Sequence, residues 1–214
     1  MIIGLVGLIG SGKGTISDYL INEYGFVSYS FASSLKDCLS AIFGWDREMI
    51  EGSTIESREW REKIDPWWAS KLSIPNFTPR WAMQNIGTEL FRNQFHTDTW
   101  ILSLQRKVLN SPSKNIVISD IRFKNEFHAV QDLGSTMIQV KRGNDPEWFK
   151  DACTVNTSTC NESGWLPASQ RLTQYNIHVS EWSIAGLQTD FTIHNDDSVD
   201  QLKAEVSKII KGLQ

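Results

Sequence analysis

A glycine-rich segment near the start of the chain carries residue types that bind phosphate. Residues 7–15 read G-L-I-G-S-G-K-G-T, and they lie between an apolar run at 2–6 and a helical pattern at 15–24. Glycines allow backbone N–H groups to turn inward around an anion, and the N-terminus of the helix adds positive potential. Lys13 adds a mobile charge that can follow the β- and γ-phosphates during transfer. The segment therefore predicts a phosphate-binding P-loop, in the strand–loop–helix context that this motif requires.

The end of this loop departs from the most common P-loop pattern. Gly14 follows the lysine, where Ser or Thr is usual, and the hydroxyl comes one residue later at Thr15. The predicted ligands of ATP are Gly10, Gly12, Lys13, Gly14 and Thr15. The G-K-G-T ending resembles that of adenylate kinases and related nucleoside monophosphate kinases, which implies that Thr15 serves the phosphates and that Mg²⁺ is held largely through water. A glycine-rich turn without a ligand is the alternative, which the lysine and its spacing disfavour.

A second candidate site follows a buried-strand pattern at residues 115–119 (N-I-V-I-S), with Asp120 next and Arg122 two residues later. In a P-loop fold the carboxyl end of such a strand lies beside the phosphate loop. Asp120 could orient Mg²⁺ through water or contact the acceptor, and Arg122 could bridge phosphates through two parallel hydrogen bonds. The alternative is an Asp cap followed by a solvated Arg.

The remaining pattern predicts the elements that position these residues. Strand patterns alternate with helical ones, which indicates an α/β fold with a central parallel sheet and helices on both faces. The expected architecture is one domain, residues 1–214, with the three-layer P-loop kinase fold. Residues 143–180 lack hydrophobic periodicity and predict an inserted lid formed by a long loop. The predicted strands are 2–6, 26–31, 115–119, 136–141 and 190–194, and the predicted helices are 15–24, 35–43, 81–95, 99–109, 124–133 and 198–213.

A Trp-rich stretch at residues 46–79 predicts helix fragments and loop. Most of the tryptophans at positions 45, 60, 67, 68, 81 and 100 are expected to pack helices together, with one or two lining the acceptor pocket, although a base-stacking platform is an alternative. Residues 56–63 (E-S-R-E-W-R-E-K) are expected to form a solvated helix face.

The composition disfavours several classes of function. With 21 basic and 25 acidic residues, the chain has a net charge of −4 and no overall basic field to hold a polynucleotide. Its apolar runs are shorter than the roughly 20 residues that cross a bilayer, and the N-terminus lacks the features of a signal peptide, which favours the cytoplasm. Cys38, Cys153 and Cys160 form an odd set without a C-x-x-C pair, which argues against a disulfide framework and against structural zinc.

Residues 80–92 (R-W-A-M-Q-N-I-G-T-E-L-F-R), followed by Trp100, carry a resemblance to a known family. The pattern R-x-x-x-Q-x-x-G-T-[DE]-L resembles bacteriophage deoxynucleoside monophosphate kinases of the T-even type. Further short matches occur in the same order, and together they span most of the chain except residues 46–79 and 143–177. These matches are S-S-L-K at 33–36, S-D-I-R at 119–122, H-V-S-E at 178–181 and H-N-D at 194–196.

The resemblance implies an acceptor-binding helical region at about residues 32–112. Lys36 and Arg80 would lie near the acceptor phosphate, Gln84 near the base, and Arg92 near the phosphates. The spacing independently places Arg80 and Gln84 on one helix face, for which a polar face in water is the alternative. Gly87 inside a helix costs roughly 1 kcal/mol relative to Ala, so a close approach of another chain segment is expected there.

The resemblance also implies roles on the side of the ATP donor. Asn195 would lie in the loop that covers the adenine, and Arg142 at the start of the lid would reach the transferring phosphoryl group. Lys141 is a competing candidate for that role. His178 and Glu181 match a family signature without a derived role, and the start of a helix is the alternative.

Together these features predict ATP- and Mg²⁺-dependent phosphorylation of deoxynucleoside monophosphates to diphosphates. Lys13, Asp120, Arg122 and Arg142 are the predicted catalytic residues, and Thr15 and Asp120 the predicted Mg²⁺ ligands. The expected partners are small nucleotides, with no polynucleotide and no membrane; a homodimer is left open, as is a host cytoplasm if the chain comes from a bacteriophage. The alternatives are a kinase for phosphomevalonate or dephospho-coenzyme A, a nucleotide-binding regulator, and a nucleic-acid end kinase with Asp120 as general base, which the acidic charge disfavours.

Overall fold

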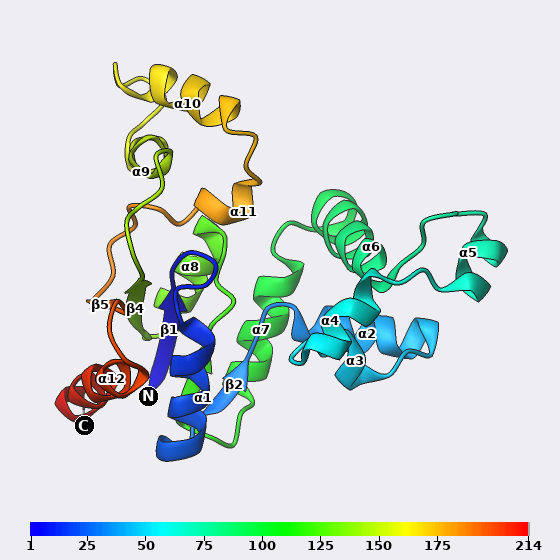
Figure 1. The fold of residues 1–214 in the computed structure, drawn as a ribbon, viewed down its shortest axis with the longest axis horizontal. Coiled ribbons are helices and arrows are strands. Elements are labelled where there is room, and N and C mark those ends of the chain that lie inside the picture. Colours follow the sequence, from blue (N-terminus) through cyan, green and yellow to red (C-terminus); the bar gives the residue numbers. More distant parts are fainter. Residues whose placement is uncertain (214) are drawn as a thin grey trace. The chain divides into compact units, whose positions relative to one another are not determined.

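The chain folds into two compact units. The first contains Met1–Ser30 together with the chain from Val108 onward, and the second is Phe31–Lys107. The structure is a computed structural model that describes residues 1–213 (Figure 1). Within that range, no helix combines the length and the apolar character needed to cross a membrane.

A parallel sheet organises the first unit. Its strands lie in the order β2-β3-β1-β4-β5, so β1 has β3 on one side and β4 on the other. The loop that follows β1 is therefore flanked by the segments that follow β3 and β4, as expected where a parallel sheet forms a site at its carboxyl edge. The predicted α/β fold is confirmed, with strand ends within two residues of those predicted. The strands are β1 (Ile2–Val6), β2 (Val27–Tyr29), β3 (Ile116–Ile118), β4 (Thr136–Lys141) and β5 (Phe191–His194).

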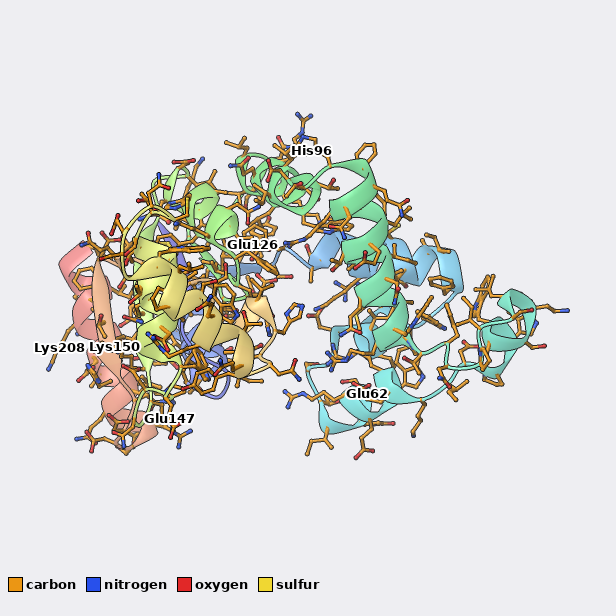
Figure 2. All side chains as sticks on the ribbon, turned by 90° about the horizontal axis from the view of Figure 1, so that it is seen from above. Glu62, His96, Glu126, Glu147, Lys150 and Lys208 are labelled. Carbon is orange, nitrogen blue, oxygen red and sulfur yellow. The ribbon has the colours of Figure 1, made fainter. Side chains whose placement is uncertain are left out.

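Helices cover both faces of this sheet, and exposed charges such as Lys150 and Lys208 lie on their outer surfaces (Figure 2). Gly25, with φ of 66°, ends the first helix as predicted, because glycine adopts the left-handed conformation without strain. The helices of this unit are α1 (Lys13–Tyr24), α8 (Lys124–Gln131), α9 (Phe149–Thr157), α10 (Trp165–Gln174), α11 (Val179–Trp182) and α12 (Val199–Leu213). A further helix, α7 (Thr99–Leu109), runs across the boundary between the two units in the sequence.

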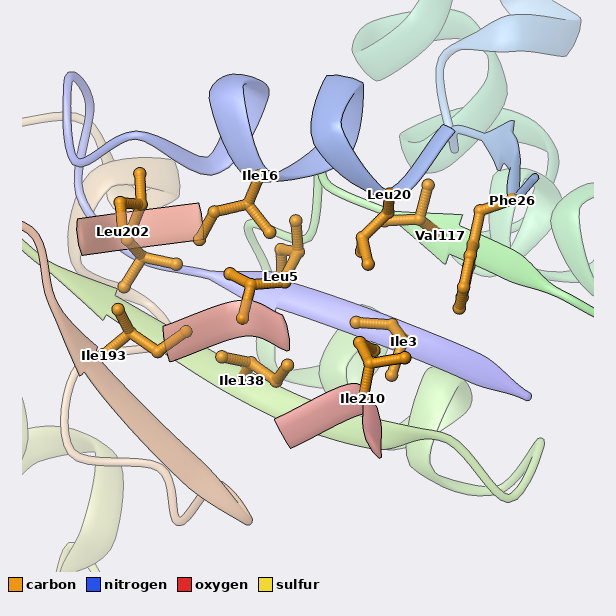
Figure 3. Packing of buried hydrophobic residues seen from close by; sticks show 12 residues of the cluster. Ile3, Leu5, Ile16, Leu20, Phe26, Val117, Ile138, Ile193, Leu202 and Ile210 are labelled. Atoms are coloured by element: carbon orange, nitrogen blue, oxygen red, sulfur yellow. The ribbon is translucent and has the colours of Figure 1, made fainter. Parts of the chain in front are cut away.

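The main hydrophobic core lies between the sheet and two helices, α1 and α12 (Figure 3). Alternate residues of β1, Ile3 and Leu5, point into it, whereas Gly4 between them faces Met137 and Ile121 on the other side of the sheet. The core therefore fixes the N-terminus of α1 directly after the carboxyl end of β1. Its other members include Ile16 and Leu20 of α1, Val117 of β3, Ile138 and Val140 of β4, Ile193 of β5, and Leu202, Val206 and Ile210 of α12.

Residues 143–180 differ from the predicted long loop, because they contain α9, α10 and the first half of α11. Each helix has ten residues or fewer, so no long hydrophobic period appears in the sequence. Tertiary contacts hold them instead: Ala152, Leu172 and Ala185 form a small separate core. Arg171 of α10 also binds the carboxylate of Asp151 on α9, with Nε–Oδ2 at 3.0 Å.

Asn156, buried at the end of α9, anchors this segment. Its Nδ2 donates to Trp182 O at 2.7 Å and to Ala185 O at 2.9 Å. We expect Asn156→Ala to lower the free energy of unfolding by about 1–3 kcal/mol, because buried carbonyl groups would lose their donor. Urea denaturation measures the change, with Asn22→Ala on the exposed side of α1 as the control. Equal stability of the two variants would contradict this role.

The second unit is helical and is built around tryptophans. Phe43 stacks on Trp45 with ring centroids 4.5 Å apart, and the Trp45 indole donates to Asp65 Oδ2 at 2.8 Å. Phe77, which is 1% exposed, contacts the rings of Phe43, Trp45 and Trp81. The expectation that most tryptophans pack helices is confirmed for this cluster. The helices are α2 (Ser33–Phe43), α3 (Arg47–Glu51), α4 (Ile55–Glu62), α5 (Pro66–Leu72), α6 (Pro79–Gln84) and the π-helix η1 (Asn85–Phe95).

The helix predicted at residues 81–95 is present, but it widens at Asn85 into a π-helix. Within it, Gly87 O accepts a hydrogen bond from Trp100 Nε1 at 2.9 Å, and a Cβ on Gly87 would lie 2.6 Å from Leu35 Cδ2. The expected close approach at Gly87 is confirmed. π-Helical segments are rare and often mark functional sites, and this one directly follows Arg80 and Gln84.

Candidate active site

The loop between β1 and α1 is shaped around two glycines that admit no side chain. Gly7 and Gly12 have φ values of 150° and 107°. A Cβ on Gly7 would lie 2.3 Å from Val140 O, and one on Gly12 would lie 2.4 Å from Asn195 Nδ2. No side chain caps the start of α1, and none of its first-turn residues is acidic. The N–H groups of that turn are thus available to an anion, and the predicted P-loop context is present.

Lys13 begins α1 and folds back over the loop. Its Nζ donates to Gly7 O at 2.7 Å and to Leu8 O at 2.9 Å. Burial, together with the nearby positive charge of Arg122, lowers the pKa of Lys13 to about 8, and the carboxylate of Glu181 opposes this shift. The ammonium group therefore lies in the loop, where phosphate oxygens could replace its two carbonyl partners.

This environment predicts a pH dependence. Lys13 is charged below a pKa of about 8 and neutral above it, and phosphate binding requires the charged form. Because kcat/KM reports groups of the free enzyme, kcat/KM for ATP should fall as the pH rises through about 8, below the value of roughly 10.4 for an ordinary lysine. Initial rates at saturating Mg²⁺ across this pH range test the prediction, which a flat profile up to about pH 10 would contradict.

Arg122 lies in the segment after β3 and is held at two points. Its backbone N–H donates to the buried carboxylate of Glu126 at 2.9 Å, and Phe123 N donates to the same oxygen at 3.1 Å. Its Nη1 donates to Glu181 Oε1 at 3.0 Å. The half-buried Asp120 begins this segment, so both predicted residues follow the strand that adjoins β1.

A cavity of about 410 Å³ opens beside the P-loop. Both candidate lid cations, Lys141 and Arg142, line it, but their environments differ. Lys141 binds Asp145 at 2.9 Å and lies 5.0 Å from the centre of the Phe149 ring, whereas Arg142 is exposed. Glu181 also lines the cavity, together with residues 7–11 of the loop.

Asn195 contacts the P-loop itself, whereas it was expected in a loop that covers the adenine. Its Nδ2 donates to Ser11 O at 2.9 Å, and its backbone N–H donates to Lys141 O at 2.7 Å. The side chain thus braces the P-loop from the end of β5, and a contact with adenine stays a prediction. Sequence reasoning did not single out Ser11, whose buried Oγ has no hydrogen-bond partner among the described residues. Its position inside the glycine-rich motif was the available signal.

The predicted acceptor residues lie in the second unit, where two of them are ion-paired. Lys36 binds Glu51, and Arg80 Nε donates to Glu62 Oε1 at 2.7 Å. Gln84 is exposed one helical turn after Arg80, and Arg92 is half-buried in η1. Lys36 and Arg80 are thus already placed against carboxylates that a phosphate could displace.

The prediction of a solvated face at residues 56–63 was wrong for two residues of α4. Ser57 is buried and caps the helix with Thr54, and Arg61 is half-buried. The Arg61 guanidinium lies against Gly52, where a Cβ would come within 2.1 Å of Cζ. Burial and the neighbouring charge of Arg80 lower the pKa of Arg61. The charged residues at 56–63 gave no sign of this packing, because the packing depends on Gly52 and Thr54 in the turn before the helix.

Comparison with known proteins identifies the family of this chain. Residues 62–157 match the family described as "Deoxynucleotide monophosphate kinase". A relative from Acanthamoeba polyphaga mimivirus, named "Putative deoxynucleotide monophosphate kinase", is 33% identical over 156 residues, which cover 66% of this chain and 74% of the relative. The chain belongs to the deoxynucleotide monophosphate kinase family.

Similarity at lower identity extends over nearly the whole chain. The deoxynucleotide monophosphate kinase of Enterobacteria phage T4 is 22% identical to it, over 99% of both chains. Among solved structures, a shikimate kinase from Aquifex aeolicus aligns with 99% of this chain and 97% of its own at 12% identity and a TM-score of 0.44. The resemblance predicted from the sequence is confirmed.

Proposed function

We propose that this chain transfers the γ-phosphoryl group of ATP to deoxynucleoside monophosphates and yields the diphosphates. The observation that carries the proposal is the convergence of Lys13, Arg122 and the uncapped N-terminus of α1 on one glycine-lined loop, in a member of the deoxynucleotide monophosphate kinase family. This arrangement binds polyphosphate and neutralises the charge that accumulates during its transfer. The viral origin of the relatives supports a setting in the host cytoplasm.

The reaction needs charge neutralisation more than proton transfer. The attacking oxygen of the acceptor phosphate is ionised at neutral pH, so no general base is required. Lys13 would exchange its two carbonyl partners for oxygens of the donor phosphates, and Arg122 would bind the phosphoryl group in transit. Arg142 would add charge from the segment after β4. The Ser11 hydroxyl, which has no hydrogen-bond partner among residues 1–213, could donate to a phosphate oxygen. These groups oppose the repulsion between two anions.

Magnesium fits the oxygen donors that are present. Thr15 is exposed in the first turn of α1, and Asp120 follows the strand next to β1, so both supply the oxygen ligands that Mg²⁺ prefers. When bound, Mg²⁺ would offset the negative charge of the phosphates during transfer. We place Thr15 and Asp120 as its ligands, mainly through water.

The acceptor side of the proposal uses the second unit. Lys36 and Arg80 would take the acceptor phosphate in exchange for Glu51 and Glu62, Gln84 would read the base, and Arg92 would add charge. Residues 143–180 would close over the donor and exclude water, which would otherwise hydrolyse ATP.

An acceptor panel tests the proposal directly. ADP formation is measured with ATP, Mg²⁺ and each of the common deoxynucleoside monophosphates, the ribonucleotides, phosphomevalonate, dephospho-coenzyme A and a 5′-hydroxyl oligonucleotide. Turnover confined to deoxynucleoside monophosphates supports the proposal. Turnover only with another acceptor would overturn the roles of Arg80 and Gln84, and ATP binding without turnover would point to a regulator.

A further inference from the structure

The proposed mechanism assigns no role to residues 178–181, but hydrogen bonds hold this segment at both ends. At its start, His178 Nδ1 accepts from Ser180 N at 3.2 Å and thereby caps α11. At its end, Asn156 binds the carbonyl oxygens of Trp182 and Ala185. Lys124, in the first turn of α8, donates to Asn156 O at 2.6 Å. The turn that carries Glu181 is therefore tied to the helix that directly follows Arg122.

Glu181 places a negative charge near the proposed site of the ATP phosphates, where it would weaken their binding. It lines the cavity beside residues 7–11, binds Arg122 at 3.0 Å, and is close enough to Lys13 to affect its charge. A carboxylate at a polyphosphate site repels the ligand, so its placement by several specific contacts calls for a compensating role. A contribution to stability is not that role, because the ion pair of Glu181 with Arg122, whose side chain is 53% exposed, contributes little to folding.

We propose that Glu181 is a positioning residue that holds the guanidinium of Arg122 towards the P-loop. This inference rests on the proposed function, since it assigns Arg122 to the transferred phosphoryl group. The buried carboxylate of Glu126 fixes the Arg122 backbone, and Glu181 fixes the end of its side chain through Nη1. An arginine has five N–H donors, so the bond from Nη1 to Glu181 leaves other donors to bind a phosphate. Preorganisation of this kind removes the cost of ordering a long side chain during transfer.

A double-mutant cycle tests the proposal with whichever acceptor the wild-type protein uses. Glu181→Gln is expected to lower kcat by about 10- to 100-fold, as a misplaced catalytic group does, with a much smaller change in KM for ATP. In an Arg122→Ala background, Glu181→Gln should lower kcat little further, because the guanidinium that Glu181 positions is absent. Glu181→Asp should recover part of the activity. Glu23→Gln, an exposed carboxylate on α1 in the same unit, is the charge-matched control and should match the wild type.

Several outcomes would overturn the proposal. An unchanged kcat in Glu181→Gln, tighter ATP binding in that variant, or full additivity with Arg122→Ala would each show that Glu181 acts otherwise. Thermal unfolding of each variant separates these results from misfolding.

A second measurement needs no turnover and so separates this proposal from the proposed function. The ¹⁵N relaxation of the Arg122 Nε–H group should report an ordered side chain in the wild type and a mobile one in Glu181→Gln. Equal mobility in the two proteins would refute the positioning role even if every acceptor in the panel fails.

Discussion

Replacing Lys13 by alanine is expected to lower kcat/KM for ATP by roughly 10³-fold or more, as the loss of a main electrostatic contact in phosphoryl transfer does. Lys13 is the group of the P-loop that supplies a full positive charge, and its Nζ lies within hydrogen-bond distance of two loop carbonyls. Backbone N–H groups can bind the phosphates but cannot follow the γ-phosphoryl as it moves. The effect should therefore appear in kcat as well as in KM.

The same change should leave the fold intact. The pKa of Lys13 is lower in the folded protein than in the unfolded chain, so its charged form opposes folding at neutral pH. Its removal relieves that cost while losing two hydrogen bonds, and the two effects oppose each other. Circular dichroism and thermal unfolding check the fold, with Lys208→Ala on the exposed side of α12 as the control for loss of a lysine. A Lys13→Ala variant with more than about a tenth of wild-type kcat/KM would refute the P-loop assignment.

Gly12→Ala is expected to weaken ATP binding by about 10- to 100-fold and to destabilise the fold by about 1–3 kcal/mol. Gly12 has φ of 107°, so any side chain there strains the backbone. The new Cβ would also lie 2.4 Å from Asn195 Nδ2 and would push that amide away from Ser11 O. The loop would then lose both its conformation and its brace.

Gly25→Ala is the matched control for this variant. Gly25 also has a positive φ, of 66°, but a Cβ there meets nothing within 4 Å. It should destabilise the protein through backbone strain while leaving ATP binding unchanged. Calorimetric titration of ATP and urea denaturation of both variants separate the two effects. Equal ATP affinity in Gly12→Ala and in the wild type would show that the loop tolerates a side chain at this position.

Sequence patterns were sufficient to predict those parts of the fold that depend on residues close together in the sequence. The P-loop was predictable because residues 7–15 combine glycine, lysine and the start of a helix over a short span. The strand Thr136–Lys141 was predicted with the correct ends, since its β-branched and apolar residues follow a turn at Gly134. Family resemblance added Arg80 and Gln84, whose roles no feature of a single sequence could distinguish from an exposed polar face.

The remaining features depend on contacts between distant residues. Glu181 meets Arg122 across 59 residues of sequence, and Asn195 meets Ser11 across 184, so no spacing rule relates either pair. Helices α9 and α10 are short, and they are held by a small apolar core of Ala152, Leu172 and Ala185 that joins residues distant in the sequence. The widening of the helix at Asn85 likewise accompanies the bond between Trp100 and Gly87, which a helical pattern does not reveal.

The second unit, Phe31–Lys107, is inserted between β2 and β3, two strands that pair directly, with Tyr29 opposite Ile118. Every group that we assign to the donor phosphates lies outside this insert, whereas Lys36, Arg80, Gln84 and Arg92 all lie within it. Substitutions in the insert can therefore change the proposed acceptor residues without changing the residues that we assign to the donor phosphates. Divergence among family members should fall unevenly on the two units, and chimaeras that exchange the insert would carry the acceptor preference of its source.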